Sequence, residues 1–231
     1  MIKRKAALRI RKTHRYLGLF IGIQFLAWTV SGLYFSWTDI DEIHGDQFRR
    51  IPSKKGIFSN LISLDSIPED IETLSLVNIK EHPYFWVNDK ILYDARLGII
   101  KNQVTKDEAL SVAKQNLIED LKVERVELLN STGPHHEYRT QSLPAYAIHF
   151  DHPDLLVAYI DAKSGMFKRV RHESWRWFDF LWMSHTMDYE GRDNFNNILL
   201  RVFSLFGLFT VISGFSLWAT SSPTLRKILK L

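Results

Sequence analysis

Residues 16–37 read YLGLFIGIQFLAWTVSGLYFSW, and this stretch decides the fold class. It contains no charged residue, and a helix of this length rises about 33 Å, enough to cross a hydrocarbon core of about 30 Å. A second apolar stretch, residues 198–219, is interrupted only by Arg201 near its start, from where the long side chain can reach the lipid headgroups. The sequence therefore predicts two transmembrane helices, with a buried helix as the alternative for the second stretch.

The charges are distributed in a way that predicts the orientation of both helices. Residues 1–15 carry seven Lys or Arg and no acid, and residues 220–231 carry three Lys or Arg and no acid. By the positive-inside rule both ends are expected to be cytoplasmic, and the region between the helices is expected on the far side of the membrane. Residues 38–197 hold all 26 acidic residues against 19 basic ones. The basic balance of the chain therefore predicts membrane-flanking clusters that face the lipid bilayer, and no nucleic-acid partner.

The residues after the first helix and the cysteine content narrow the possibilities further. Trp37, Thr38 and Asp39 offer no small-residue cleavage site, so we expect the first helix to be a retained signal anchor. The chain has no cysteine, which excludes disulfides, thiolate metal sites and iron–sulfur ligation. Any metal or cofactor must be held by His, carboxylate or Met side chains.

The region between the two helices predicts a linker followed by an α+β domain. Residues 38–60 contain Pro52, Gly56 and two Lys, which is typical of a linker. A helix is indicated at VTKDEALSVAKQNLIEDL, where Thr105 and Glu108 form a capping box. Strand-like runs occur at residues 73–77, 83–87, 90–98, 122–129, 145–150 and 155–160.

An internal echo predicts two similar β-hairpins. ILYDARLGIIKN (residues 91–102) and AYIDAKSGMFKR (residues 158–169) share an Asp-Ala-basic-x-Gly turn between apolar runs. We expect Gly98 and Gly165 to adopt positive φ in these turns. Asp94 and Asp161 are then interpreted as turn-forming residues and not as catalytic ones.

These motifs carry a family resemblance. TKDEALSVAKQNL, followed by KVERVELL, AYAIHF and VAYIDAKSG, resembles a PepSY domain over roughly residues 105–170, with residues 73–103 similar to a degenerate first copy. Together with RKTHRYLGLFIG and a Ser-Gly pair in the second helix, the chain resembles the PepSY-associated transmembrane helix family of bacterial inner-membrane proteins. The resemblance implies a membrane α plus α+β fold, with a periplasmic PepSY-like domain at residues 61–172. An interfacial aromatic helix and loop are expected at residues 173–197.

Three histidines lie near the predicted membrane boundaries and suggest a cofactor. Neutral imidazole is the usual axial ligand of b-type haem, and larger members of the family include haem-bearing ferric-siderophore reductases. His44 and His185 are expected on the outer side, where they could ligate one haem b; Asp188, Tyr189 or Arg192 could support His185. His14 is alone on the cytoplasmic side, so a haem there would need a second protomer, which makes a homodimer conceivable. Interfacial anchoring is the alternative for all three histidines.

The remaining histidines and the absence of common enzyme motifs say less about function. The pair His135 and His136 lies in a polar loop and is interpreted as solvated. No hydrolase, P-loop or dinucleotide-binding motif is present, so electrons would have to come from another protein or quinol, and enzymatic activity is left open. The sequence thus favours haem-linked electron transfer to an outer acceptor such as ferric iron. The alternatives are an anchored PepSY module that binds or restrains a partner protein, and an assembly subunit of a membrane complex.

The ends of the two apolar stretches repeat one phrase. Residues 29–37 read TVSGLYFSW and residues 210–218 read TVISGFSLW. Because the helices are expected to be antiparallel, the two Ser-Gly pairs should lie at opposite depths and cannot line one common site. We interpret them, together with Gly18 and Gly22, as small residues that allow close helix packing.

Overall fold

The computed structural model describes residues 4–50 and 56–222 and divides the chain into two compact units. Unit 1 consists of residues 1–37 and 179–231, and unit 2 of Thr38–Phe178. The helix α4 (Glu173–Thr186) contributes its first six residues to unit 2 and the rest to unit 1.

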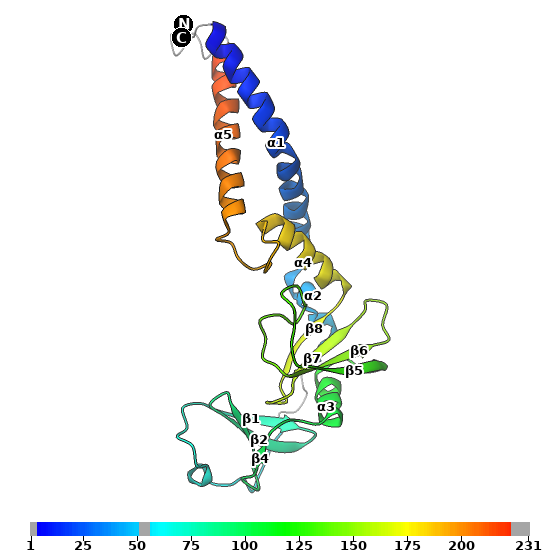
Figure 1. The fold of residues 1–231 in the computed structure, drawn as a ribbon. Coiled ribbons are helices and arrows are strands. Elements are labelled where there is room, and N and C mark those ends of the chain that lie inside the picture. Colours follow the sequence, from blue (N-terminus) through cyan, green and yellow to red (C-terminus); the bar gives the residue numbers. More distant parts are fainter. Residues whose placement is uncertain (1–3, 51–55, 223–231) are drawn as a thin grey trace. The chain divides into compact units, whose positions relative to one another are not determined.

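Unit 1 is built around two long helices, α1 (Arg4–Trp37) and α5 (Ile198–Ser221), which lie side by side and run antiparallel (Figure 1). Phe20 of α1 packs against Phe203 and Phe206 of α5, with ring centroids 5.6 and 5.9 Å apart. The side-chain oxygen of Asn197 caps α5 by accepting a hydrogen bond from the backbone N–H of Leu200. α1 ends at Trp37 and α5 begins at Ile198, as the apolar stretches predict, whereas α1 begins at Arg4, before its apolar stretch.

Both helices are long and apolar enough to span a membrane. The apolar segments are Leu8–Trp37 and Ile198–Ala219, and only 11% of the most apolar window of each is buried inside the protein. Leu19 and Ile23, for example, are 74% and 77% exposed. A core helix of a water-soluble protein would bury most of such a window, so this surface calls for an apolar environment.

Glycines of α5 contribute to the packing of α1 on α5, and Gly214 is one of those that the sequence predicted as packing residues. A Cβ atom at Gly207 would lie 3.1 Å from the ring of Phe25, and one at Gly214 would lie 3.2 Å from His14. By contrast, a Cβ at Gly18 or Gly22 would meet no atom within 4 Å. Bulky α1 side chains therefore fit against the glycines of α5, whereas Gly18 and Gly22 make no such contact, and their role in helix packing stays a prediction.

Unit 2 contains two antiparallel four-stranded sheets with strand orders β1-β2-β3-β4 and β5-β6-β7-β8. The strands of the first sheet are β1 (Leu74–Ile79), β2 (His82–Val87), β3 (Ile91–Asp94) and β4 (Ile100–Lys101). Those of the second are β5 (Val123–Leu129), β6 (Ala145–Phe150), β7 (Val157–Asp161) and β8 (Phe167–Arg171). Two antiparallel sheets with a short helix agree with the predicted α+β domain.

The helix α3 (Lys106–Asn116) lies between the two sheets in the chain and contacts both. Its capping box is confirmed: the Thr105 hydroxyl accepts from the Glu108 N–H, and the Glu108 carboxylate accepts from the Thr105 N–H. One apolar core joins α3 to both sheets; it includes Ile79, Trp86 and Leu92 of the first sheet, Val112 and Ala113 of α3, and Ile148 and Ile160 of the second sheet. The sheets are thus parts of one folded unit.

Both predicted hairpin turns are confirmed. Gly98 and Gly165 have φ of 69°, a left-handed conformation that costs a side chain-bearing residue energy. Asp94 accepts from the N–H groups of residues 96 and 97, and Asp161 accepts from those of residues 163 and 164. The repeated Asp-Ala-x-x-Gly pattern therefore encodes the same turn twice.

Part of the predicted linker is folded. The short helices α2 (Ile40–His44) and η1 (Asp46–Phe48) occupy its first half, and the side chains of Ile43 and Phe48 are buried. His172 is buried as well, and its Nε2 donates to the carbonyl oxygens of Glu42 and Ile43 at 3.1 Å. This segment is ordered because its apolar side chains enter the core next to β8. A further short helix, η2 (Leu64–Ser66), precedes the first sheet.

Candidate functional site

His185 lies in the last turn of α4 and is held against α1. Its Nδ1 is 2.7 Å from the hydroxyl oxygen of Ser31, and its backbone carbonyl accepts a hydrogen bond from the indole N–H of Trp28 at 2.8 Å. The edge of the imidazole also meets the ring of Phe35, with centroids 5.6 Å apart. Burial lowers the pKa of His185 and so favours the neutral imidazole. The ring is therefore fixed by polar contacts on one side and aromatic contacts on the other.

His14 makes the corresponding contact near the other end of the helix pair. Its Nδ1 is 2.8 Å from the hydroxyl oxygen of Ser213 on α5. The neighbouring Gly214 leaves room for the imidazole, because a Cβ there would lie 3.2 Å from the Cε1 atom of His14. Ser213 and Gly214 thus form the contact surface for His14. Ser213 is its hydrogen-bond partner, and the missing side chain of Gly214 leaves room for the imidazole ring.

The hydrogen bonds of the two serines assign the tautomer of each histidine. Ser31 donates its hydroxyl proton to the carbonyl of Ala27 at 2.8 Å, and Ser213 donates to the carbonyl of Thr210 at 2.7 Å. A hydroxyl has one proton, so each oxygen is left as an acceptor toward Nδ1. We therefore place the imidazole proton on Nδ1 in both histidines. Nε2 then carries an unshared lone pair, and it is the atom that can bind a metal or accept a proton.

The two His–Ser contacts are placed at opposite ends of unit 1. His14 and Ser31 are 17 residues apart on α1, which corresponds to about 25 Å along the helix axis. Each contact uses one Ser-Gly pair of the repeated phrase, TVSG for His185 and TVISG for His14. This geometry agrees with the expectation that the two Ser-Gly pairs cannot line a common site. The pairs do more than allow close helix packing, because each serine also contacts a histidine.

A serine next to a histidine raises the question of nucleophilic catalysis. In a Ser–His dyad the imidazole accepts the serine proton and so activates the oxygen. Here the hydroxyls of Ser31 and Ser213 each have a helix carbonyl as acceptor, and with the assigned tautomers Nδ1 is the donor toward each serine oxygen. The arrangement therefore orients the imidazoles and does not activate the serines.

His44 belongs to unit 2 and His185 to unit 1. His44 is the last residue of α2 and is exposed, in contrast to its buried neighbour Ile43. It is thus free to meet a ligand from outside unit 2. The pairing of His44 with His185 on one haem stays a prediction.

The expected supporting residues of His185 serve the loop after α4 instead. Asp188 accepts from the N–H groups of Gly191 and Asn194, and Arg192 forms an ion pair with Asp179 of α4. Tyr189 is exposed. The partner that holds the imidazole is Ser31, which the sequence predicts only as a small helix-packing residue. The repeated TVSG and TVISG phrases were the signal that could have identified both serines.

The remaining histidines are confined to unit 2. His82 pairs with Asp94 at 2.7 Å, and His136 accepts from the N–H of Tyr138. His135 is exposed, which agrees with the interpretation of the pair as solvated, whereas His136 is half-buried and its ring packs against that of Tyr159. No group of three or more His, Asp or Glu side chains that could hold a metal ion occurs within residues 4–50 and 56–222.

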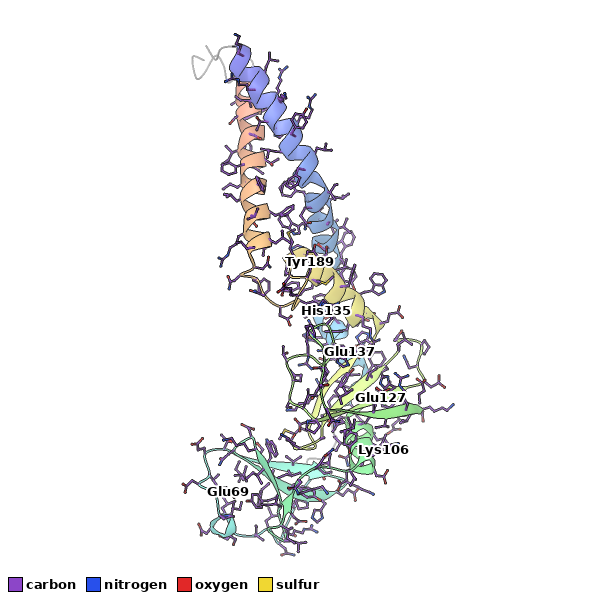
Figure 2. All side chains as sticks on the ribbon, viewed as in Figure 1. Glu69, Lys106, Glu127, His135, Glu137 and Tyr189 are labelled. Atoms are coloured by element: carbon purple, nitrogen blue, oxygen red, sulfur yellow. The ribbon has the colours of Figure 1, made fainter. Side chains whose placement is uncertain are left out.

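A second candidate site is a pocket of about 550 Å³ on the face of the second sheet that points away from α3. Glu127, His135 and Glu137, which are labelled in Figure 2, belong to its lining. The Glu137 carboxylate accepts from the Tyr159 hydroxyl at 2.7 Å and from Arg176 Nε at 2.6 Å. The pocket therefore has acidic, basic and imidazole groups at its rim and a fixed carboxylate within.

Comparisons with known proteins add no identification. No protein-family model, curated protein or solved structure matches the chain. The functional conclusion has to rest on the geometry of the sites.

Proposed function

We propose that this chain is a haem-linked electron-transfer component of the bacterial inner membrane. It would deliver electrons to an acceptor, such as ferric iron, on the periplasmic side, where residues 38–178 would lie. The observation that carries the proposal is the pair of imidazoles at opposite ends of α1. The Nδ1 atom of each lies within hydrogen-bond distance of a serine hydroxyl oxygen, and with the proton assigned to Nδ1 the lone pair of Nε2 would be available to bind iron.

The donor set suits haem b. Histidines that bind metals usually donate their second ring N–H to a protein oxygen, which fixes the ring and raises its basicity, and both serines supply such an oxygen. Haem bound at these histidines would supply one-electron carriers. His14 and His185 would ligate iron, Ser213 and Ser31 would orient them, and the rings of Trp28 and Phe35 would exclude water from the second site.

The spacing of the two histidines fits transfer across a membrane. Both apolar helices are long enough to span it, and about 25 Å of α1 separates His14 from Ser31. That distance covers most of a hydrocarbon core of about 30 Å. Two carriers placed in this way would bring an electron from one face of the membrane to the other.

A reduced-minus-oxidised visible spectrum of the full chain in detergent tests the proposal. We expect Soret and α bands in the wild type, a partial loss in either His14→Ala or His185→Ala, and a complete loss in the double variant. His136→Ala is the matched control, because its imidazole also serves a local hydrogen bond but lies in unit 2. A colourless wild type, produced with ample haem supply, would refute the proposal.

The second candidate function is an anchored PepSY module that binds a partner protein. The pocket on the second sheet favours it, because its mixed charges suit a peptide with both acidic and basic groups. Under this function Glu137→Ala would abolish capture of the partner in membranes cross-linked before extraction. Glu69→Ala, which removes a carboxylate elsewhere in unit 2, would leave capture of the partner intact. Equal capture by both variants would exclude the pocket as the binding site.

A further inference from the structure

We infer that the free edge of β5 is a docking site for an extended segment of a partner protein, which adds to the second sheet as a further strand and places a basic side chain beside the pocket. This inference rests on the second candidate function, the binding of a partner protein by unit 2, and it does not depend on haem. It goes further by naming the surface, the backbone groups and the kind of segment that binds.

β5 lies at one edge of the second sheet and pairs with β6 on one side (Figure 1). The bonds between β6 and the β7 side show the direction of the β6 backbone groups. The N–H of Phe150 donates to the carbonyl of Leu156, and the carbonyl of Pro144 accepts from the N–H of residue 162. Because these groups alternate in direction along a strand, the even-numbered residues of β6 bond toward β7 and the odd-numbered ones toward β5.

This alternation leaves two residues of β5 with backbone groups that point outward. The odd-numbered residues of β6 stand opposite Arg125, Glu127 and Leu129, so these three supply the bonds of the β5–β6 ladder. Val126 and Leu128 lie between them and direct their N–H and C=O groups to the outer edge. Within residues 4–50 and 56–222, no hydrogen bond to these outer groups occurs. The edge thus offers two donors and two acceptors at the spacing that an added strand uses.

The other edge strands of unit 2 are less suited to accept a strand. β4 has two residues, and β8 is contacted by α2. β1 is exposed in its first half, but Val77 and Ile79 in its second half are buried. β5 has seven residues, and none of them is buried. It is therefore the longest edge open to a partner in the described part of unit 2.

The side chains of β5 define what the added strand should carry. Arg125, Glu127 and Leu129 line the pocket of about 550 Å³. Val126 and Leu128 point to the opposite face, where Val126 packs on the core and Leu128 is 42% exposed. Directly opposed residues of paired strands point to the same face. The residues opposite Val126 and Leu128 should therefore be apolar, and the residue between them, opposite Glu127, should face the pocket.

The charge at this edge favours a basic side chain at the middle position. Glu124 and Glu127 both form ion pairs with Arg125, at 3.9 and 2.8 Å, so the three residues together carry one negative charge. His149 contacts Arg125, and burial together with this guanidinium lowers the pKa of the imidazole. His149 therefore adds no compensating charge at neutral pH. A Lys or Arg opposite Glu127 would balance the charge, whereas a Glu would be repelled.

Three fluorescein-labelled peptides test the docking site on the full chain in nanodiscs. The first has the core Val-Lys-Val, the second has Val-Glu-Val, and the third has Val-Lys-Val with both valine nitrogens methylated. Fluorescence anisotropy gives the Kd of each peptide, and hydrogen exchange reports the protection of the β5 amides.

We expect the first peptide to bind and to protect the amides of Val126 and Leu128. The second should bind roughly 2- to 30-fold more weakly, because a cross-strand attraction is replaced by a repulsion. The third should not bind detectably, since it cannot donate to the carbonyls of the edge. Equal binding of the methylated and unmethylated peptides would overturn the inference. Failure of all three peptides to bind, or protection confined to residues outside β5, would overturn it as well.

Variants of the chain separate docking from destabilisation, which urea unfolding monitors. Leu128→Pro removes an outward N–H that makes no ladder bond, so the sheet should stay folded while the first peptide loses about ten-fold in affinity. Leu128→Ala keeps this N–H and is the matched control. Glu127→Gln should reduce the preference for Lys over Glu, and Glu119→Gln, which removes an exposed carboxylate outside the pocket, should retain it. If Leu128→Pro fails to fold, the methylated peptide still decides.

Capture of the partner in cross-linked membranes distinguishes this inference from the function on which it rests. If Glu137→Ala abolishes capture and Leu128→Pro leaves it intact, the edge of β5 is not the docking site but the second candidate function stands. If neither variant lowers capture, both fall. A chain that dimerises alone, and that Leu128→Pro converts to a monomer, would identify a second copy as the occupant and overturn the assignment to a partner protein.

Discussion

Removal of the serine hydroxyls should weaken haem binding in a way that simple loss of helix packing would not. Ser31→Ala deletes the oxygen 2.7 Å from Nδ1 of His185, and Ser213→Ala deletes the oxygen 2.8 Å from Nδ1 of His14. Loss of such a supporting partner typically lowers metal affinity about 10- to 100-fold, which corresponds to about 1.4–2.8 kcal/mol. The reduction potential of the affected haem should rise, because an imidazole without this hydrogen bond donates less charge to ferric iron.

The helices provide matched controls. Ser36 and Ser216 also donate to carbonyls of their own helices, at 2.9 and 2.8 Å, and neither is hydrogen-bonded to a histidine in the described part of the chain. Haem titration and potentiometry of Ser36→Ala and Ser216→Ala should give wild-type values, and Ser213→Thr should retain most of the affinity because it keeps the oxygen. If Ser213→Ala behaved like Ser216→Ala in both measurements, the reasoning from tautomer to ligand would be refuted.

Two further predictions concern the stability of unit 2, measured by urea unfolding of the full chain in detergent. Gly98→Ala and Gly165→Ala both place Ala at a φ of 69°, which should lower the free energy of unfolding by about 1–2 kcal/mol. Gly165→Ala should lower it by about 1–3 kcal/mol more, because its Cβ would lie 2.4 Å from the buried side chain of Ile79. The Cβ of Gly98→Ala would lie 3.3 Å from Ile62, which is a milder contact. Equal losses would contradict this packing argument. Burial alone would raise the pKa of Asp94, but hydrogen bonds from Arg96, Leu97 and His82 lower it overall. The stability that this carboxylate contributes should be present above the ordinary pKa of 3.8 and lost as the pH falls through the lower folded value, and Asp94→Asn should flatten the unfolding profile in that acidic range.

The sequence predicts well the features that depend on neighbouring residues. The capping box at Thr105 and the turns at Gly98 and Gly165 are encoded within a few positions, and the structure has them as predicted. The two apolar helices follow from length and hydropathy alone. Local chemistry therefore identifies the elements and most of their bounds.

Features that depend on distant partners are not predictable in this way. Tyr138 comes from a polar loop, yet it is fully buried because its ring stacks on Tyr159 with centroids 4.6 Å apart. The burial of His172 depends on carbonyls of α2, about 130 residues earlier in the chain. The contact of His14 with Ser213 likewise joins residues from the two ends of the chain. Periodicity carries no information on such pairs. For the two His–Ser contacts, the repeated Ser-Gly phrase was the one signal in the sequence.

The two His–Ser contacts also have a purely structural reading, in which they hold the helices of unit 1 together. Interhelical hydrogen bonds in membranes contribute about 0.6 kcal/mol on average and up to about 1.7 kcal/mol. Substitution by asparagine separates this reading from the proposed one. The side-chain amide of Asn can place an N–H near the position of imidazole Nδ1, so it preserves the bond to serine, but it offers no Nε2 to iron.

His14→Asn and His185→Asn should therefore keep the thermal stability of the wild type apoprotein while each removes one haem from the visible spectrum. Alanine at the same positions should lose both the haem and the contribution of the hydrogen bond. Gln is the complementary variant, because its longer side chain puts the amide near Nε2 and leaves the serine without its donor. If both Asn variants retained the full haem spectrum, the histidines would be helix contacts only, because the proposed ligation uses the lone pair of imidazole Nε2 and asparagine has no such nitrogen.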